Sequence, residues 1–171
     1  VLTLFAYTCG FSVSAATTGA RTTSIDLSRK YLDWGRRNFA ANRLDAFPHE
    51  FLVGDVFDWL GRFQRKGRRF DAIVLDPPTF SRSRQSGAFR AEADYSKLIA
   101  HAVAVLKSNG VLLACNNAAR VAPVDFVAAT QAAVAQAGRQ VKQLHYIPQP
   151  PDFPITRAEP AYLKTVWLRL D

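Results

Sequence analysis

Three aspartates stand at the ends of short segments that are each predicted to be a strand. Asp26 follows "TTSI", Asp55 follows "EFLVG" and Asp76 follows "IVL". Ligands of open parallel sheets bind beyond the carboxyl ends of the strands, so three carboxylates there would share one edge. A carboxylate after the second strand can accept both hydroxyls of a ribose, and one after the third can accept the amino group of adenine. The acids therefore predict a site for an adenosine-containing ligand, although each alone is also typical of a helix N-cap or a surface loop.

The first predicted strand is followed by a turn of small residues, in which Gly10 stands between Thr8 and Ser12. Glycine at such a turn lets the backbone approach a cofactor closely. The stretch lacks the G-x-G-x-x-G fingerprint of dinucleotide sites, because its next glycine is Gly19, and the chain has no Walker sequence. An adenosine-containing cofactor without a pyrophosphate fits this pattern better than a nicotinamide dinucleotide.

Short apolar runs alternate with segments of helical length, and this order predicts an α/β fold with a mostly parallel sheet covered by helices on both faces. The last two strands are joined by a loop too short for a helical crossover, so we expect them to be antiparallel. In the helix after Asp26, we expect Ser28 to be the N-cap and Tyr31, Trp34 and Phe39 to lie on or near one face. The predicted strands are 1–7, 22–26, 50–55, 70–76, 111–117, 140–147 and 161–170, and the predicted helices are 28–44, 56–66, 93–108 and 123–137.

Length and composition favour an ordinary globular domain. The chain has 171 residues, enough for one domain with a full hydrophobic core. No apolar run approaches the roughly 18 residues of a membrane span, and the first residues lack the charged region of a secretory signal. Its two cysteines, Cys9 and Cys115, are too few for a disulfide framework and do not have the spacing of metal ligands. We therefore expect a reduced cytoplasmic protein with no metal and no membrane partner.

The charge is positive and unevenly distributed. The chain has 22 Lys and Arg against 14 Asp and Glu, a net charge of +8. A basic field attracts a polyanion, although a solvated basic face is the simpler explanation. The stretch from 62 to 90 contains only Asp71 and Asp76 as acids, against Arg62, Arg65, Lys66, Arg68, Arg69, Arg82, Arg84 and Arg90.

Six segments occur in order along the chain and together resemble one protein family. They are "LFAYT.GFSV", "SIDLSRKYLDW", "NF..N.L", "GDVFDWL", "FDAIVLDPPTFSRS" and "NGVLLACNN". The set is similar to the Rossmann-like, class I S-adenosylmethionine-dependent methyltransferases that modify 23S ribosomal RNA, in particular the group containing the 5-methylcytosine enzyme and the 7-methylguanosine-forming module of a bifunctional enzyme. The resemblance covers nearly the whole chain. It implies a seven-stranded sheet with an antiparallel C-terminal strand, S-adenosylmethionine as cofactor and 23S ribosomal RNA as partner. We expect residues 1–171 to be one methyltransferase domain from the C-terminal part of a longer chain.

The resemblance also implies which residues hold the cofactor. The turn after the first strand would shape the methionine side, the end of the second strand would hold the ribose, and the end of the third would bind the adenine edge. The residues carried over in this way are Ala6, Tyr7, Thr8, Gly10, Phe11, Asp26, Leu27, Asp55, Val56 and Asp76.

The rigid segment after the fourth predicted strand, residues 76–80, would contact the target base. Two prolines fix φ there, the acid and a fixed carbonyl can orient the base, and Phe80 can stack on it, unless that ring belongs to the core. We expect the catalytic floor to be Asp76, Pro77, Pro78 and Phe80, and the substrate contacts to be Thr79, Phe80, Arg82, Arg84 and Asn117.

The acceptor atom is left open between two chemistries. Methylating carbon 5 of cytosine needs a cysteine thiolate, for which Cys115 is the candidate. The guanine-modifying relatives instead match the Asn116-Asn117 pair, and we favour a guanine nitrogen, N7 in particular. The C-terminal "ITRAEPAYLKTVWLRL" is more similar to the cytosine branch. A methyltransferase of this fold acting on a substrate other than RNA is the further alternative.

Two positions depart from the family pattern. Thr3 stands where relatives usually have Asn, and Cys9 where they have a second glycine. Thr3 can still form a hydrogen bond, whereas Cys9 adds a side chain and disfavours positive φ. These departures are compatible with weaker cofactor binding or with an RNA-binding module whose cofactor pocket has degenerated.

Overall fold

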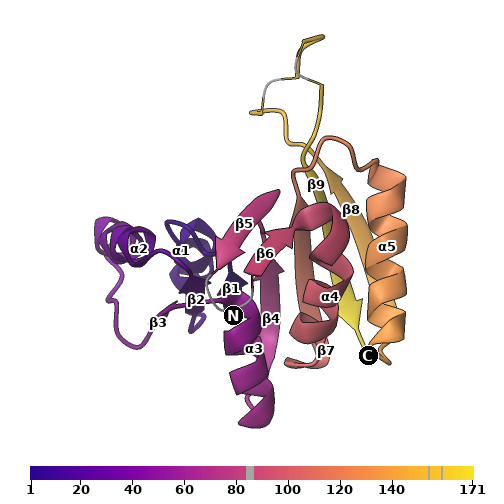
Figure 1. Ribbon diagram of the computed structural model, residues 1–171. Helices are drawn as coiled ribbons and strands as arrows, with labels where there is room; N and C mark the ends of the chain where they lie inside the picture. The colour runs from indigo at the N-terminus through magenta and orange to yellow at the C-terminus, as the bar shows by residue number, and fades with distance from the viewer. Residues whose placement is uncertain (84–86, 154, 159) are drawn as a thin grey trace.

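A single seven-stranded sheet forms the centre of the molecule (Figure 1), in a computed structural model that describes residues 1–83, 87–153, 155–158 and 160–171. The strand order is β3-β2-β1-β4-β7-β9-β8. Neighbours from β3 to β7 are parallel, whereas β9 is antiparallel to both β7 and β8. The strands are β1 (Leu2–Leu4), β2 (Thr23–Asp26), β3 (Glu50–Val53), β4 (Phe70–Leu75), β7 (Leu106–Asn116), β8 (Val141–Pro148) and β9 (Lys164–Leu170).

Five helices cover this sheet in two groups, as the alternation of apolar runs predicts. The helices are α1 (Gly10–Thr17), α2 (Arg29–Ala41), α3 (Val56–Arg65), α4 (Ala91–Val103) and α5 (Pro123–Gln136). The first two pack around a small core cluster that includes Leu32 and Phe39. The other three pack with the central strands around a larger core that includes Leu60, Ile99 and Val134. The α/β fold class and the antiparallel C-terminal strand are therefore confirmed.

The two helices after β2 and β3 show how local sequence sets the packing. Ser28 accepts a hydrogen bond from the Tyr31 backbone N–H and is the N-cap of α2, as predicted. Of the three aromatic residues expected on or near one face of α2, only Phe39 is buried, whereas Tyr31 and Trp34 are exposed. The buried face contains Gly35 instead, a residue with no apolar side chain to reveal it.

The predicted arginine-rich loop after β4 is a hairpin, formed by β5 (Phe80–Ser83) and β6 (Gly87–Arg90). Its serines and arginines lack the apolar alternation that signals a strand, so the sequence gives no warning of it. Phe89 anchors the hairpin, since its ring is buried and lies 5.5 Å from the ring of Phe5. The following helix begins and ends earlier than predicted, and β7 begins at Leu106, with an irregular register before Val111.

No helix among the described residues is long and apolar enough to cross a membrane.

Candidate functional site

The carboxyl ends of β1, β2, β4 and β7 surround a cavity of about 350 Å³, here called the central cavity. It lies where the strand order reverses between β1 and β4, the usual ligand site of such sheets. The three acids that follow predicted strands all line it, as expected from their positions. The other predicted residues in its lining are Tyr7, Leu27, Val56, Pro77, Pro78 and Asn117.

Asp26 ties the end of β2 to the turn after β1. Its Oδ2 accepts a hydrogen bond from the Tyr7 backbone N–H at 2.9 Å, and its Oδ1 accepts one from the Ser28 N–H at 2.8 Å. These two bonds fix the orientation of the carboxylate. A carboxylate has about four lone-pair sites, so this group can still accept hydrogen bonds from a pair of ligand hydroxyls.

Asp55 serves as a helix cap and lines the central cavity as well. Its Oδ1 accepts hydrogen bonds from the Phe57 and Asp58 N–H groups at 2.9 and 3.3 Å, at the start of α3. The residue is buried, with 6% of its surface exposed. The structural and the functional interpretation of this aspartate therefore do not exclude each other.

A second hollow of about 430 Å³, the helix-side cavity, lies between the end of β1 and the start of α1. Phe5, Tyr7 and Cys9 all have positive φ in this turn, at 57°, 47° and 64°. Such conformations cost about 1–3 kcal/mol each and persist only where the surroundings hold them. Asn38 supplies one such restraint, because its Nδ2 donates to the Thr8 carbonyl at 2.8 Å. The predicted residues that line this cavity are Ala6, Tyr7, Thr8, Gly10, Phe11 and Asp76.

The two departures from the family pattern are both accommodated in the packing beneath this turn. Thr3 is buried, and its hydroxyl accepts a hydrogen bond from Ser12, which is in turn bonded to Ser24. The Cys9 side chain fills space that Gly35 leaves open, since a Cβ on that glycine would lie 2.4 Å from the sulfur. Cys9 does adopt the positive φ that a glycine would favour, and its burial raises the pKa of the thiol.

Two polar groups in the central cavity have no hydrogen-bond partner among the residues that the structure describes. Asp76 accepts no hydrogen bond and forms no ion pair with any described residue, and Asn117 Oδ1 is buried without a donor within the same part of the chain. Solvent reaches Asp76 through the cavity, yet the surrounding protein removes part of its hydration, and this desolvation raises the pKa of the carboxyl. Buried acceptors without donors are rare in folded proteins, so Asn117 Oδ1 indicates a ligand that brings a donor, and Asp76 offers that ligand a second acceptor in the same cavity.

The remaining predicted substrate residues lie beside the cavity. Phe80 is 54% exposed, which excludes a core role for its ring, and neither it nor Thr79 lines the cavity. Arg82 is exposed on β5. Arg84 lies outside the described residues. Ser81, which was not predicted, does line the cavity.

Cys115 is poorly suited to nucleophilic attack. It is buried in β7 and does not line the central cavity. Burial, together with the negative charge of Asp76, raises the pKa of its thiol to about 12, although Thr165 donates a hydrogen bond to the sulfur. Its carbonyl is held by the buried Tyr95 hydroxyl at 2.6 Å.

Sequence reasoning missed the aromatic wall of the central cavity. Phe5 and Tyr31 both line it, and the Tyr31 ring makes an edge contact with Tyr7 at 4.5 Å between centroids. Tyr31 could have been identified from its place in the first turn of α2. This helix follows β2 and must begin at the carboxyl edge of the sheet, where the ligand binds. Ser14 of the helix-side cavity, one turn into α1, was missed in the same way.

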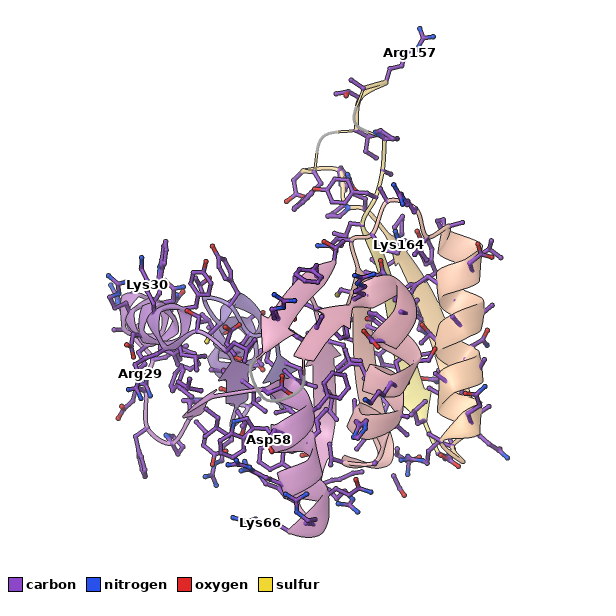
Figure 2. All side chains as sticks on the ribbon, viewed as in Figure 1. Arg29, Lys30, Asp58, Lys66, Arg157 and Lys164 are labelled. Atoms are coloured by element: carbon purple, nitrogen blue, oxygen red, sulfur yellow. The ribbon has the colours of Figure 1, made fainter. Side chains whose placement is uncertain are left out.

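The basic stretch predicted from 62 to 90 does not form one surface. The residues from Arg62 to Arg69 lie at the end of α3 and before β4, at the amino edge of the sheet, where Figure 2 shows Lys66. There Arg68 pairs with Glu50, and Arg62 pairs with Asp58 at 2.8 Å. Among the described basic residues of this stretch, Arg82 and Arg90 of the hairpin are the ones on the side of the central cavity.

Comparison with known proteins places this geometry in a family. Residues 1–169 match the family described as S-adenosylmethionine-dependent methyltransferase. The ribosomal RNA large subunit methyltransferase K of Neisseria meningitidis serogroup B is 47% identical over 118 residues, which are 68% of this chain and 33% of that protein. The ribosomal RNA large subunit methyltransferase K/L of Psychrobacter sp. (strain PRwf-1) is 46% identical over 121 residues, 68% of this chain and 15% of that protein.

One solved structure is similar over almost the whole chain. SMU.776 in complex with SAH has a TM-score of 0.86 and 33% identity, covering 98% of this chain and 44% of that one. This chain therefore spans less than half the length of each of these three proteins.

Proposed function

Since this chain belongs to the family of S-adenosylmethionine-dependent methyltransferases, we propose that it methylates a base of large-subunit ribosomal RNA, at N7 of a guanine. The cofactor is S-adenosylmethionine. The substrate is proposed from two kinds of support: the names of the relatives and the chemistry of the central cavity.

The residues at the carboxyl edge fit this cofactor. Asp26 is oriented to accept the ribose hydroxyls, and Leu27, Tyr31 and Val56 offer apolar walls for an adenine ring. The helix-side cavity meets the central cavity at Phe5, Tyr7 and Asp76, so the two together give room for an elongated ligand. The N-terminus of α1 borders the helix-side cavity, and its backbone N–H groups favour a ligand carboxylate there.

Guanine is proposed as the methylated base because of the Asp76 carboxylate and the Asn117 Oδ1, which have no hydrogen-bond donor among the described residues. Asp76 and Asn117 Oδ1 present acceptors in one cavity. The Watson–Crick edge of guanine offers adjacent donors, its N1–H and its 2-amino group, whereas cytosine has an acceptor at N3 beside its amino group. A guanine bound through these donors would keep N7 on the opposite side of the ring system.

The proposed reaction needs positioning and no proton transfer. When bound, the cofactor supplies an electrophilic methyl group on a sulfonium sulfur. The N7 lone pair of the base forms the new bond to that carbon as the bond from carbon to sulfur breaks, with its electron pair left on sulfur. Pro77 and Pro78 keep the floor stiff, and the Asp76 carboxylate stabilises the positive charge that the purine gains. No proton leaves the base, so no general base is required.

The alternative chemistry at carbon 5 of cytosine is disfavoured by Cys115. The attack on carbon 6 requires a thiolate near the base, but this thiol is buried, has a pKa raised to about 12 and lies outside the lining of the cavity. The exposed hairpin arginines Arg82 and Arg90 support an RNA substrate over a small molecule, since they can contact phosphates beside the cavity. A ribosomal substrate supports a cytoplasmic location, which belongs to the same proposal.

The proposal is tested by identifying the methylated nucleoside. The protein is incubated with S-adenosylmethionine and 23S ribosomal RNA transcribed in vitro, and the RNA is digested to nucleosides for mass spectrometry. We expect 7-methylguanosine from the wild type and very little from Asp76→Asn. Asp71→Asn is the matched control, because Asp71 lies at the far end of the same strand and pairs with Lys107 on the surface. Formation of 5-methylcytidine, or no methylated RNA from a protein that binds the cofactor, would contradict it.

A further inference from the structure

A third hollow, here called the distal cavity, lies on the other side of the turn that follows β7. Its volume is about 160 Å³. At about 30 Å³ per water molecule, this corresponds to roughly five waters, enough for one ring and too little for a whole nucleotide. Val121, Pro123 and Tyr146 contribute apolar walls, whereas Gln149 and Lys164 bring polar groups.

Lys164 is a buried cation with no anionic partner among the described residues. It is the first residue of β9, at the edge of the sheet from which the loop bearing Arg157 projects (Figure 2), and only 3% of its surface is exposed. Its Nζ donates to the carbonyls of Ala118 and Tyr162, at 2.8 and 2.7 Å. No carboxylate of the described ranges pairs with it, and burial lowers the pKa of its ammonium group. A buried ammonium with only two carbonyl partners can donate one further hydrogen bond.

Gln149, another lining residue, holds a second donor in the wall of the same cavity. Its Oε1 accepts hydrogen bonds from the Tyr162 and Leu163 N–H groups, both at 3.0 Å. Only an oxygen can accept these two bonds, so the amide orientation is fixed and Nε2 must lie on the opposite side. The residue is 92% buried, and Nε2 has no acceptor among the residues that the structure describes. An unpaired buried donor of this kind calls for a ligand with an acceptor.

The distal cavity is a near neighbour of the central cavity. Asn117 lines the central cavity and Ala119 lines the distal one, so two residues of extended chain, at most about 7 Å, separate the two positions. Ala118, between them, is the residue whose carbonyl holds Lys164. Unstacked bases of one RNA strand can enter two such neighbouring sites, as single-stranded RNA is commonly read.

We propose that the distal cavity is a second base subsite, which binds a nucleotide flanking the methylated one through a carbonyl oxygen on its ring. The oxygen accepts hydrogen bonds from Gln149 Nε2 and Lys164 Nζ, and the ring rests against Tyr146. Guanine, uracil and cytosine carry such an oxygen and adenine does not, so the subsite selects against adenine. This inference rests on the proposed function, because it takes the central cavity as the site of an RNA base.

The test is RNA binding by Gln149→Glu. This change keeps an oxygen for the Tyr162 and Leu163 N–H groups, so the turn at 162–163 retains these two hydrogen bonds, but it replaces the donor at Nε2 with an acceptor. Gln143→Glu is the matched control, with the same charge change at an exposed position of β8 far from the cavity. The probe is a 23S ribosomal RNA fragment containing the methylated nucleotide, with each flanking nucleotide replaced in turn by adenosine or by an abasic site.

We expect Gln149→Glu to bind the unmodified fragment about ten-fold more weakly than the wild type, the effect of one lost base contact, and the control to match the wild type. The RNA affinity of the wild type should also fall about ten-fold when one flanking nucleotide is replaced by adenosine, whereas the affinity of Gln149→Glu should not change on that replacement. Binding is measured by fluorescence anisotropy at fixed salt, and affinity for S-adenosylhomocysteine by calorimetry should be the same in all three proteins.

Three outcomes would overturn the inference. The first is equal RNA affinity of Gln149→Glu and the wild type. The second is a loss of affinity in Gln149→Glu that is the same for every flanking base and for the abasic site, since this would indicate that the cavity contacts a phosphate and not a base. If the wild type methylates the RNA in either of these cases, only the subsite is refuted. A wild type that binds the cofactor but neither binds nor methylates ribosomal RNA refutes the proposed function, and the subsite with it. If Gln149→Glu fails to fold, Lys164→Met takes its place in the same experiment. We expect this variant, too, to bind the unmodified RNA and the RNA with the adenosine replacement equally well.

Discussion

Replacing Asp26 by alanine should greatly weaken binding of the cofactor. The carboxylate is oriented by the Tyr7 and Ser28 N–H groups at 2.9 and 2.8 Å and faces the central cavity. A hydrogen bond to a charged group contributes about 1.5–3 kcal/mol, so losing two ribose contacts costs at least about 3 kcal/mol. That is a dissociation constant raised roughly 100-fold or more. The turn at Tyr7, with its positive φ, also loses an anchor, which adds to the loss.

Calorimetric titration with S-adenosylhomocysteine measures this effect without depending on turnover. Asp26→Asn keeps one oxygen but turns an amide N–H toward one of the two backbone donors, so its affinity should fall between those of the wild type and Asp26→Ala. Asp33→Ala removes the same charge from an exposed position on α2, where Asp33 pairs with Arg36, and should bind as the wild type does. Affinity of a folded Asp26→Ala within about three-fold of the wild type would refute the assignment of the ribose site.

Three further predictions concern stability and reactivity. Gly35→Ala should lower the free energy of unfolding by about 1–3 kcal/mol in urea titrations, because its Cβ would lie 2.4 Å from the Cys9 sulfur. Adding Cys9→Gly to this variant should restore most of the lost stability, and purely additive effects of the two changes would contradict a direct contact between the residues. Cys115→Ala should retain methyl transfer, and the native thiol should resist iodoacetamide at pH 8, where a pKa of about 12 leaves about one thiolate in 10⁴; rapid alkylation would show that the thiol is accessible. The hydrogen bond from Arg68 lowers the pKa of Glu50 in the folded state, so this ion pair stabilises the fold fully above pH 4.5, the pKa of an unfolded glutamate, and loses its effect as the pH falls through the lower folded pKa. Glu50→Gln should therefore flatten the fall in unfolding free energy at acid pH. An unchanged fall would contradict this prediction.

The positions of the acids could be predicted because they depend on strand direction alone. A predicted strand ends at each of Asp26, Asp55 and Asp76, and parallel strands bring those ends to one edge. The same rule explains why the basic stretch from 62 to 90 does not form one surface. Arg68 and Arg82 stand on either side of the six residues of β4, whose two ends lie about 20 Å apart on opposite edges of the sheet. Closeness in sequence is therefore a poor guide across a strand.

Other features depend on packing that no local pattern records. The β5–β6 hairpin is held by a polar ladder and by one buried ring, Phe89, so its sequence reads as a loop. Gly35 is buried because Cys9 occupies the space beside it, a contact between residues 26 positions apart. The unpaired donor of Gln149 likewise depends on a turn at 162–163 that folds back onto its oxygen. Each of these required the tertiary structure.

The double duty of two aspartates limits how this pocket can be re-engineered for cofactor analogues. Asp55 starts α3, and Asp26 joins the turn after β1 to α2, so replacing either one to admit an enlarged nucleoside would also loosen the framework around it. Leu27 and Tyr31 line the same cavity, are partly exposed, and cap no helix through their side chains. Libraries aimed at bulky adenosine analogues should therefore trim these two side chains and leave both carboxylates in place.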